Sequence, residues 1–154
     1  MHPNAALLSR FYEAFGRRDH AAMAACYGPQ AHFSDPVFTD LRGPQVTAMW
    51  RMLCIRATDL RIEASGFQAD GQRGTAHWEA WYSFSATRRS VHNVIEASFT
   101  FDAGLIATHC DSFDLYRWAR QALGVKGLLL GWAPPVQRSI RSTAARGLAR
   151  SMES

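Results

Sequence analysis

The sequence lacks the features of membrane-spanning and disulfide-stabilised proteins. No apolar stretch approaches the roughly 20 residues that a membrane-spanning helix needs. Cys26, Cys54 and Cys110 show neither paired spacing nor a CxxC motif, which predicts free thiols and a reducing, cytoplasmic location. No basic segment followed by an apolar run is present at the start, so we expect no secretory signal.

Lysine is nearly absent, and the positive charge is local. The 154 residues carry a formal net charge of +4 but include one lysine. From Arg117 onward, seven Arg or Lys residues face one acid, Glu153. No aromatic residues are interleaved with the arginines of the tail, which argues against a nucleic-acid partner. A composition of 47% hydrophobic and 19% charged residues is typical of one folded globular domain.

Hydrophobic spacing predicts helices first and strands afterwards. A stripe of Leu7, Leu8, Phe11 and Phe15 is typical of a helix buried on one face. Proline and glycine mark the boundaries of the other elements. The expected helices span 4–18, 21–27, 44–57 and 115–123, and the expected strands span 31–37, 60–68, 74–86, 93–101 and a last strand from 105. Residues 124–135 are expected to form an apolar loop before a basic amphipathic helix at 136–152.

The stretch from Asn93 to Asp114 has the pattern of a β-hairpin with an ionisable inner face. Apolar and polar residues alternate before the turn at 102–104, which places one side of each strand in the interior. Pairing Phe101 with Leu105 would put His109 and Asp111 on that apolar side. Two ionisable groups that face an apolar interior need either hydrogen-bond partners or a function.

These elements predict an α+β fold. We expect a cone-shaped, strongly bent antiparallel sheet wrapped on three N-terminal helices, with an extra C-terminal amphipathic helix. Residues 1–124 would form the domain and 125–154 an extension of it. A bent sheet leaves an apolar pocket against its helices. The expected ligand-binding side chains are Phe11, Tyr12, Phe15, Trp50, Trp78, Tyr82, Ile95, Ala97, Phe99 and Phe113.

The order of elements and two motifs resemble the nuclear transport factor 2-like superfamily, which includes SnoaL-like polyketide cyclases, ketosteroid isomerase and limonene-epoxide hydrolase. The motif His32-Phe33-Ser34-Asp35-Pro36 is similar to the isomerase segment whose Asp-Pro supplies the proton-shuttling carboxylate. The segment from Asp102 to Leu115 is similar to the final strand of the hydrolase, where the position of Asp111 is a catalytic carboxylate. The resemblance covers roughly residues 5–124 and implies the fold, a pocket without cofactor and a homodimer.

Other family positions depart from the pattern of a single activity. Phe11 occupies the place of the isomerase tyrosine, with Tyr12 adjacent, and Ala97 occupies the place of its second hydrogen-bond donor. The hydrolase pair Arg-x-Asp corresponds to residues 78–80, Trp-Glu-Ala. The resemblance therefore implies a chemistry class, acid–base catalysis on a small apolar molecule, without a particular reaction.

The expected catalytic residues are Asp35, His109 and Asp111, each with a structural alternative. Desolvation beside a cavity would raise the pKa of Asp35 into the range useful for moving protons, whereas a turn aspartate would only bind backbone amides. Asp111 would serve as a base or an anion stabiliser with His109 as its proton partner. Alternatively, Asp111 anchors a buried Trp, Tyr or backbone donor, and His109 fills space.

Two further groups admit more than one interpretation. His77, Glu79, His92 and Glu96 could form a polar cluster on the opposite side of the sheet, as a solvated face or a dimer contact. Their spacing lacks a metal signature, so we expect no metal. The basic C-terminal helix has too small an apolar stripe for stable membrane insertion. A non-catalytic ligand-binding or dimerisation module remains the alternative to an enzyme.

Overall fold

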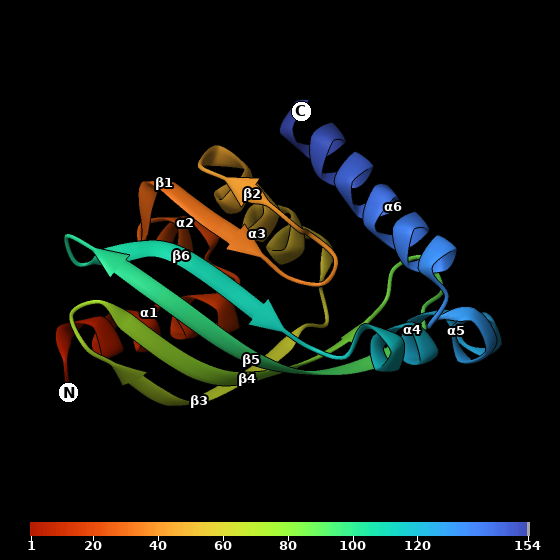
Figure 1. Ribbon diagram of the computed structural model, residues 1–154, viewed down its shortest axis with the longest axis horizontal. Coiled ribbons are helices and arrows are strands. Elements are labelled where there is room, and N and C mark those ends of the chain that lie inside the picture. The colour runs from red at the N-terminus through yellow and green to blue at the C-terminus, as the bar shows by residue number, and fades with distance from the viewer. Residues whose placement is uncertain (154) are drawn as a thin grey trace.

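Residues 1–153 are described by a computed structural model, in which helices pack around a six-stranded sheet (Figure 1). The helices are α1 (Pro3–Gly16), α2 (His20–Ala24), α3 (Pro44–Arg56), α4 (Leu115–Leu123), α5 (Val125–Leu130) and α6 (Pro134–Glu153). The strands are β1 (Tyr27–Ser34), β2 (Leu41–Arg42), β3 (Arg61–Ala69), β4 (Arg73–Ser83), β5 (Ser90–Asp102) and β6 (Leu105–Ser112). The predicted α+β class is confirmed.

The strand order in the sheet is β2-β1-β6-β5-β4-β3. Every neighbouring pair is antiparallel except β1 and β6, which are parallel. This parallel pair differs from the fully antiparallel sheet that hairpin spacing suggested. Because β1 and β6 are joined through most of the chain rather than by a tight turn, their connection imposes no antiparallel pairing.

Apolar residues of α1, α3 and the inward face of the sheet form the main core. In α1, Phe11 and Phe15 are buried as the helical spacing predicted. The His2 imidazole caps this helix by accepting a hydrogen bond from the backbone N–H of Asn4. Asn4 lies inside the helix, where its side-chain amide donates to the carbonyl of Asp70. Asp19 caps α2 through the N–H of Ala22.

The hairpin of β5 and β6 has the predicted parity but not the predicted register. Phe101 pairs with Ile106 rather than with Leu105, and a bulge leaves Ala107 unpaired. Beyond the bulge, His109 lies opposite Phe99. The pairing is thus shifted by two residues from the expected one. A shift by an even number returns every side chain to the same face, so the inward direction of position 109 is unchanged.

The C-terminal segment packs over the end of the sheet (Figure 1). The expected loop at 124–135 was wrong in part, because 125–130 form helix α5. α6 runs back along the molecule towards α3, and its Leu148 joins the main core. Arg141 of α6 donates a hydrogen bond from Nε to the carbonyl of Pro36, at 2.8 Å. Across residues 1–153, no helix is both long and apolar enough to cross a bilayer.

Candidate functional site

The inward face of β6 carries a buried imidazole and carboxylate in direct contact. His109 is 1% exposed and Asp111 is 3% exposed. Their side chains point the same way because they are two residues apart on one strand. His109 Nε2 lies 2.8 Å from Asp111 Oδ1, and Trp78 Nε1 donates to the same oxygen at 3.3 Å. Both groups therefore lie inside the cone, as the alternation of the hairpin predicted.

A second hydrogen-bond arm extends from the other side of the imidazole. His109 Nδ1 lies 2.7 Å from the hydroxyl of Tyr27, and that hydroxyl accepts a bond from Trp50 Nε1 at 2.8 Å. If the Tyr27 hydroxyl donates to Nδ1, then Nε2–H donates to Asp111. Every polar hydrogen in this series of hydrogen bonds then has an acceptor. The five side chains thus form a directional relay that ends on the Asp111 carboxylate.

Aromatic rings enclose this relay on several sides. The imidazole of His109 lies 4.3 Å from the ring of Phe99 and 4.9 Å from that of Phe33, between centroids. Most of the expected ligand-binding residues are in the main core, namely Phe11, Tyr12, Phe15, Trp50, Trp78, Ile95, Ala97 and Phe99. Tyr82 and Phe113 are partly buried and pack against both this core and a second cluster around Trp118. The rings fill much of the cone with one another.

Tyr12 is the exception to hydrogen-bond satisfaction in this interior. Its ring lies 5.9 Å from the Trp78 ring and also stacks on Phe67. Its hydroxyl is buried, and among residues 1–153 it has no hydrogen-bond partner. Burial raises the pKa of Tyr12 well above its usual value, and the nearby Asp111 charge raises it further. The hydroxyl is thus a neutral donor held inside an apolar space near Asp111, where an unpaired polar group is costly.

Asp35 lies in the turn after β1, where the chain leaves the sheet. Its Oδ1 accepts the backbone N–H groups of Val37 at 2.7 Å and Phe38 at 2.6 Å. Burial raises the pKa of Asp35 to about 7, against the lowering effect of these two bonds, and the charge of Asp111 contributes to the rise. The two alternatives for Asp35 therefore both apply: its side chain binds the backbone amides of a turn, and its pKa is raised.

One surface cavity lies beside this turn rather than inside the cone. It has a volume of about 490 Å³ between residues 37–41 and α6, and Arg141 is among its lining residues. The second cavity lies on the β3–β4 hairpin. None of the expected ligand-binding side chains lines either cavity.

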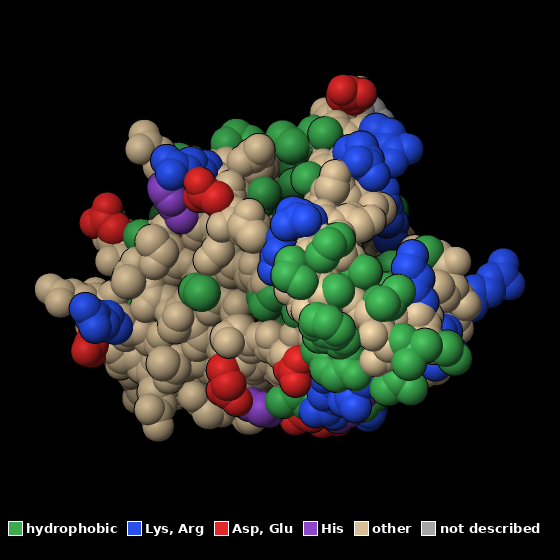
Figure 2. All heavy atoms as spheres, turned by 45° about the vertical axis from the view of Figure 1, so that its right-hand side comes forward, with side chains coloured by type: hydrophobic (Ala, Val, Ile, Leu, Met, Phe, Trp, Pro, Cys, Tyr) green, Lys and Arg blue, Asp and Glu red, His purple; other side chains and the backbone are tan. Residues whose placement is uncertain are grey.

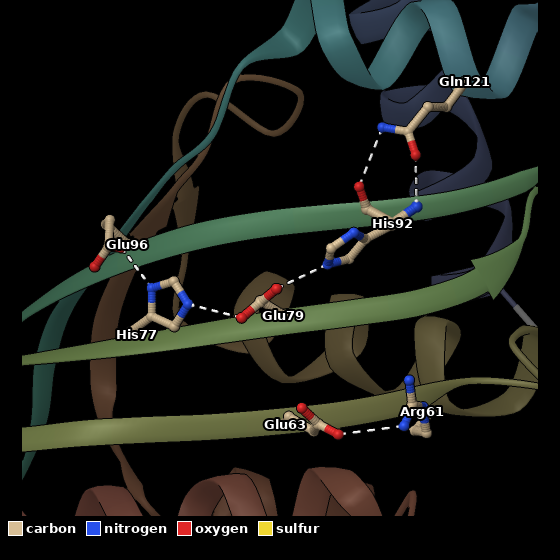
Figure 3. Close-up of polar contacts among 7 residues, drawn as sticks. All are labelled: Arg61, Glu63, His77, Glu79, His92, Glu96 and Gln121. Atoms are coloured by element: carbon tan, nitrogen blue, oxygen red, sulfur yellow. Dashed lines mark hydrogen bonds and ion pairs between the residues drawn. The ribbon is translucent and has the colours of Figure 1, made fainter.

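The polar cluster of His77, Glu79, His92 and Glu96 lies on the outer face of the sheet. Figure 3 shows His77 between two carboxylates, 2.5 Å from Glu96 and 3.0 Å from Glu79, which also bonds His92 at 2.8 Å. Glu79, followed by Glu96, raises the pKa of His77. The ring of His92 stacks on Trp81 at 4.6 Å. No group of three or more His, Cys, Asp or Glu residues within 1–153 is arranged to hold a metal ion.

The fold and the sequence together decide the family. The chain matches the SnoaL-like domain family over residues 8–109. It belongs to that family. The resemblance to the nuclear transport factor 2-like superfamily is therefore confirmed. No curated protein sequence matches the chain significantly.

Solved structures share the SnoaL-like fold at low sequence identity. A nuclear transport factor 2-like protein of unknown function from Burkholderia pseudomallei is 22% identical with a TM-score of 0.69, and the match covers 79% of this chain and 98% of that one. A putative polyketide cyclase from Pseudomonas putida is 20% identical with a TM-score of 0.66 and the same coverage. An epoxide hydrolase of the LEH-like type from M. tuberculosis is 20% identical with a TM-score of 0.62, covering 87% and 95%.

Sequence reasoning missed Tyr27, which joins Trp50 to His109. The Gly28-Pro29 pair was interpreted as the end of a helix that contained Tyr27, whereas β1 begins at that residue. The alternation of β1 gave no clear signal for this residue, because the strand is irregular between Tyr27 and His32.

Proposed function

We propose that this SnoaL-like protein is an enzyme that performs acid–base chemistry, without a cofactor, on a small apolar molecule that carries a carbonyl or another polarised oxygen. The reaction class is isomerisation, cyclisation or hydrolysis. The substrate occupies the interior of the cone beside Tyr12 and Asp111.

The unpartnered hydroxyl of Tyr12 is the observation that carries this proposal. A buried hydroxyl without a partner costs free energy, and such groups are uncommon in folded proteins. A substrate oxygen that accepts its hydrogen bond would remove this cost. Donors aimed at an oxygen that gains negative charge provide one of the largest catalytic effects in enzymes. Tyr12 therefore takes the role of the oxygen-polarising donor.

Asp35 is the proposed base. A carboxyl group with a pKa of about 7 is partly ionised near neutral pH and strong enough to accept a proton from carbon. Both of its hydrogen bonds from residues 1–153 reach Oδ1, so Oδ2 takes the proton. As the C–H bond breaks, its electron pair moves towards the substrate oxygen, which Tyr12 stabilises. The proton then returns to the substrate at a second position.

The relay on β6 supports the proton transfer. Asp111 lies close enough to Asp35 and Tyr12 for its charge to raise the pKa of both groups. In the proposed mechanism, Tyr27 and His109 orient the Asp111 carboxylate, which takes up the proton that Asp35 removed from the substrate and gives it back at the second position. Entry of the substrate requires the partly buried Tyr82 and Phe113 to move aside, because they pack between the two apolar clusters.

Turnover of a panel of small lactones, enones and epoxides tests this function. For any compound that is converted, Asp35→Asn is expected to lower kcat by about 10²–10⁴-fold. Tyr12→Phe is expected to lower it by about 10²–10³-fold because the oxygen loses a donor. Both variants keep the size of the side chain, and Glu79→Gln on the outer face is the matched control. Wild-type turnover in both inner variants would contradict the proposal.

A non-catalytic ligand-binding module is the second proposal, because one observation favours it. The Oδ1 atom of Asp35 is held by two backbone amides, and the rings around His109 pack against one another, as in a structural core. This alternative predicts that compounds from the panel raise the melting temperature of the protein and are recovered unchanged.

A further inference from the structure

Helix α5 and the turn after it expose large apolar side chains that cover no other part of the protein. Val125 is 71% exposed, Leu129 is 62% exposed and Trp132 is 64% exposed. The set of exposed residues in this segment is Val125, Leu128, Leu129, Leu130 and Trp132, here called the α5 patch. Figure 2 shows hydrophobic side chains gathered at this end of the molecule, with Lys and Arg around them and some Asp or Glu along the lower edge. A concentration of this kind marks an interaction site.

Packing against α4 fixes the outward direction of the patch. A Cβ atom at Gly127 would overlap the carbonyl oxygen of Ala119, and one at Gly131 would lie 2.9 Å from the Ala119 Cβ. Only glycine allows this close approach, so α5 turns its glycines towards α4 and its leucines towards the outside. Tyr116 donates to the carbonyl of Leu128 at 2.7 Å and ties the helix down further. The patch is therefore presented on a fixed backbone.

Three basic side chains lie close to the α5 patch. Lys126 lies within α5 and is exposed. Arg120 lies over the Tyr116 ring, 5.1 Å from its centroid, and Arg89 packs against Gly124 at the start of α5. The chain from residue 115 to 152 contains seven Lys or Arg residues and no Asp or Glu. An apolar surface within an uninterrupted basic segment is complementary to a surface that is apolar inside and negatively charged outside.

We propose that the α5 patch binds reversibly to the surface of an anionic lipid bilayer, with its leucines and Trp132 in the headgroup region and Lys126, Arg120 and Arg89 against the lipid phosphates. This surface satisfies both features at once, because apolar side chains reach the acyl boundary while basic side chains meet anionic headgroups. Tryptophan favours this interfacial depth.

The shape of the patch favours a bilayer over a peptide. The exposed side chains of the α5 patch project from a short helix and the turn after it, whereas docked peptides occupy a groove. The patch lies on short α5 and the following turn, so it attaches the protein to a surface without crossing it. This inference is independent of the proposed chemistry inside the cone, which uses none of these residues.

Co-sedimentation with two kinds of vesicle tests the proposal. The full chain is mixed with vesicles of phosphatidylcholine alone and with vesicles of phosphatidylcholine and phosphatidylglycerol. We expect binding to the mixed vesicles, little binding to the neutral ones, and a loss of binding as salt is added. Lys126→Gln should weaken binding to the mixed vesicles about fivefold. Leu129→Gln should weaken it about tenfold or more.

Matched variants distinguish binding through the α5 patch from nonspecific binding. Ile55 is also a large apolar residue, 57% exposed on α3, so Ile55→Gln should bind like the wild type, and Arg10→Gln controls for Lys126→Gln. Equal binding to both vesicle types, or unchanged binding by Leu129→Gln and Lys126→Gln, would overturn the proposal. Self-association that Leu129→Gln abolishes, without vesicle binding, would assign the patch to a second copy. Capture by an acidic protein without vesicle binding would also overturn it.

Discussion

The two faces of the sheet carry similar residues in opposite environments. On the inner face, His109 and Asp111 are 2.8 Å apart and their side chains are almost completely buried. On the outer face, His77 and Glu79 are 3.0 Å apart, and about a third of each side chain is exposed. The distances barely differ, but the surroundings do. Water can replace the outer contacts, whereas inside the cone no water compensates for a lost partner.

This difference in burial distinguishes the two groups of His and acidic residues. The outer cluster spreads its charges over four side chains in contact with solvent, where an ion pair contributes little. The inner pair belongs to a relay that includes Tyr27, Trp50 and Trp78. Low polarity strengthens each bond of such a relay and makes each break costly. Inner substitutions should therefore have much larger effects than matched outer ones.

The largest expected effect is the loss of the inner carboxylate. Asp111→Ala leaves His109 Nε2 and Trp78 Nε1 without their shared acceptor and should lower the free energy of unfolding by about 3–5 kcal/mol. Glu79→Ala is the matched outer change and should cost far less, because its contacts are exposed to solvent. Chemical denaturation of the two variants measures the contrast. Equal losses would show that the two faces do not differ in the way described.

Asp35 provides an intermediate case at the rim of the sheet, because its residue remains partly exposed. Its pKa is raised from 3.8 in the unfolded chain to about 7 in the folded protein. The folded state therefore binds more protons between these values, and stability should fall as pH rises from about 4 to about 7. Asp35→Asn should remove this loss and stabilise the protein at pH 8 by on the order of 2–3 kcal/mol.

Denaturation of wild type and Asp35→Asn at pH 4 and pH 8 measures this change. The asparagine Oδ1 still accepts from Val37 and Phe38, so the turn is preserved. The raised pKa predicts that the variant gains stability over the wild type between pH 4 and pH 8. A stability difference between the two proteins that is the same at both pH values would contradict it.

A smaller effect is expected at the far end of the inner relay. Tyr27→Phe removes the hydroxyl that accepts from Trp50 and contacts His109. Leaving these buried groups without a partner should cost about 1–3 kcal/mol in unfolding free energy. Tyr116→Phe, which also removes one hydroxyl bond but at an exposed site, is the control. A melting curve that is the same for both variants would exclude a special role for Tyr27.

The smallest effect is expected on the outer face. Glu79 is the main cause of the raised pKa of His77, so Glu79→Gln should lower that pKa towards its usual value. The raised pKa contributes stability that is present below about pH 6.5 and is lost at higher pH. The change in stability should be small, because solvent screens this contact. An NMR titration of the His77 ring detects the shift, and an unchanged pKa in the variant would refute the assignment.

Sequence patterns predicted the inner face well because parity survives errors of register. His109 and Asp111 point inward even though Phe101 pairs with Ile106 instead of Leu105 and the pairing beyond the bulge is shifted by two residues. Asp19 and Asp114 each cap a helix by accepting a backbone N–H three residues ahead, which is a local contact of the kind that sequence patterns encode. Contacts that depend on distant segments were not predictable.

Tyr27, Tyr12 and α5 show what local patterns cannot predict. The bond between Tyr27 and His109 joins residues 82 positions apart, and no local pattern encodes it. The missing partner of the Tyr12 hydroxyl is a property of the packed interior. The α5 segment resembled a loop because its glycines, which break isolated helices, here allow contact with α4.

Steady-state turnover of Asp111→Asn beside Glu79→Gln tests the account most directly, with any compound that the wild type converts. Asparagine keeps an oxygen that can accept from both His109 and Trp78 but cannot hold the proton of the reaction. The account predicts a loss of about 10²–10⁴-fold in kcat for the inner variant and none for the outer one. An inner variant that turns over as fast as the wild type would contradict it.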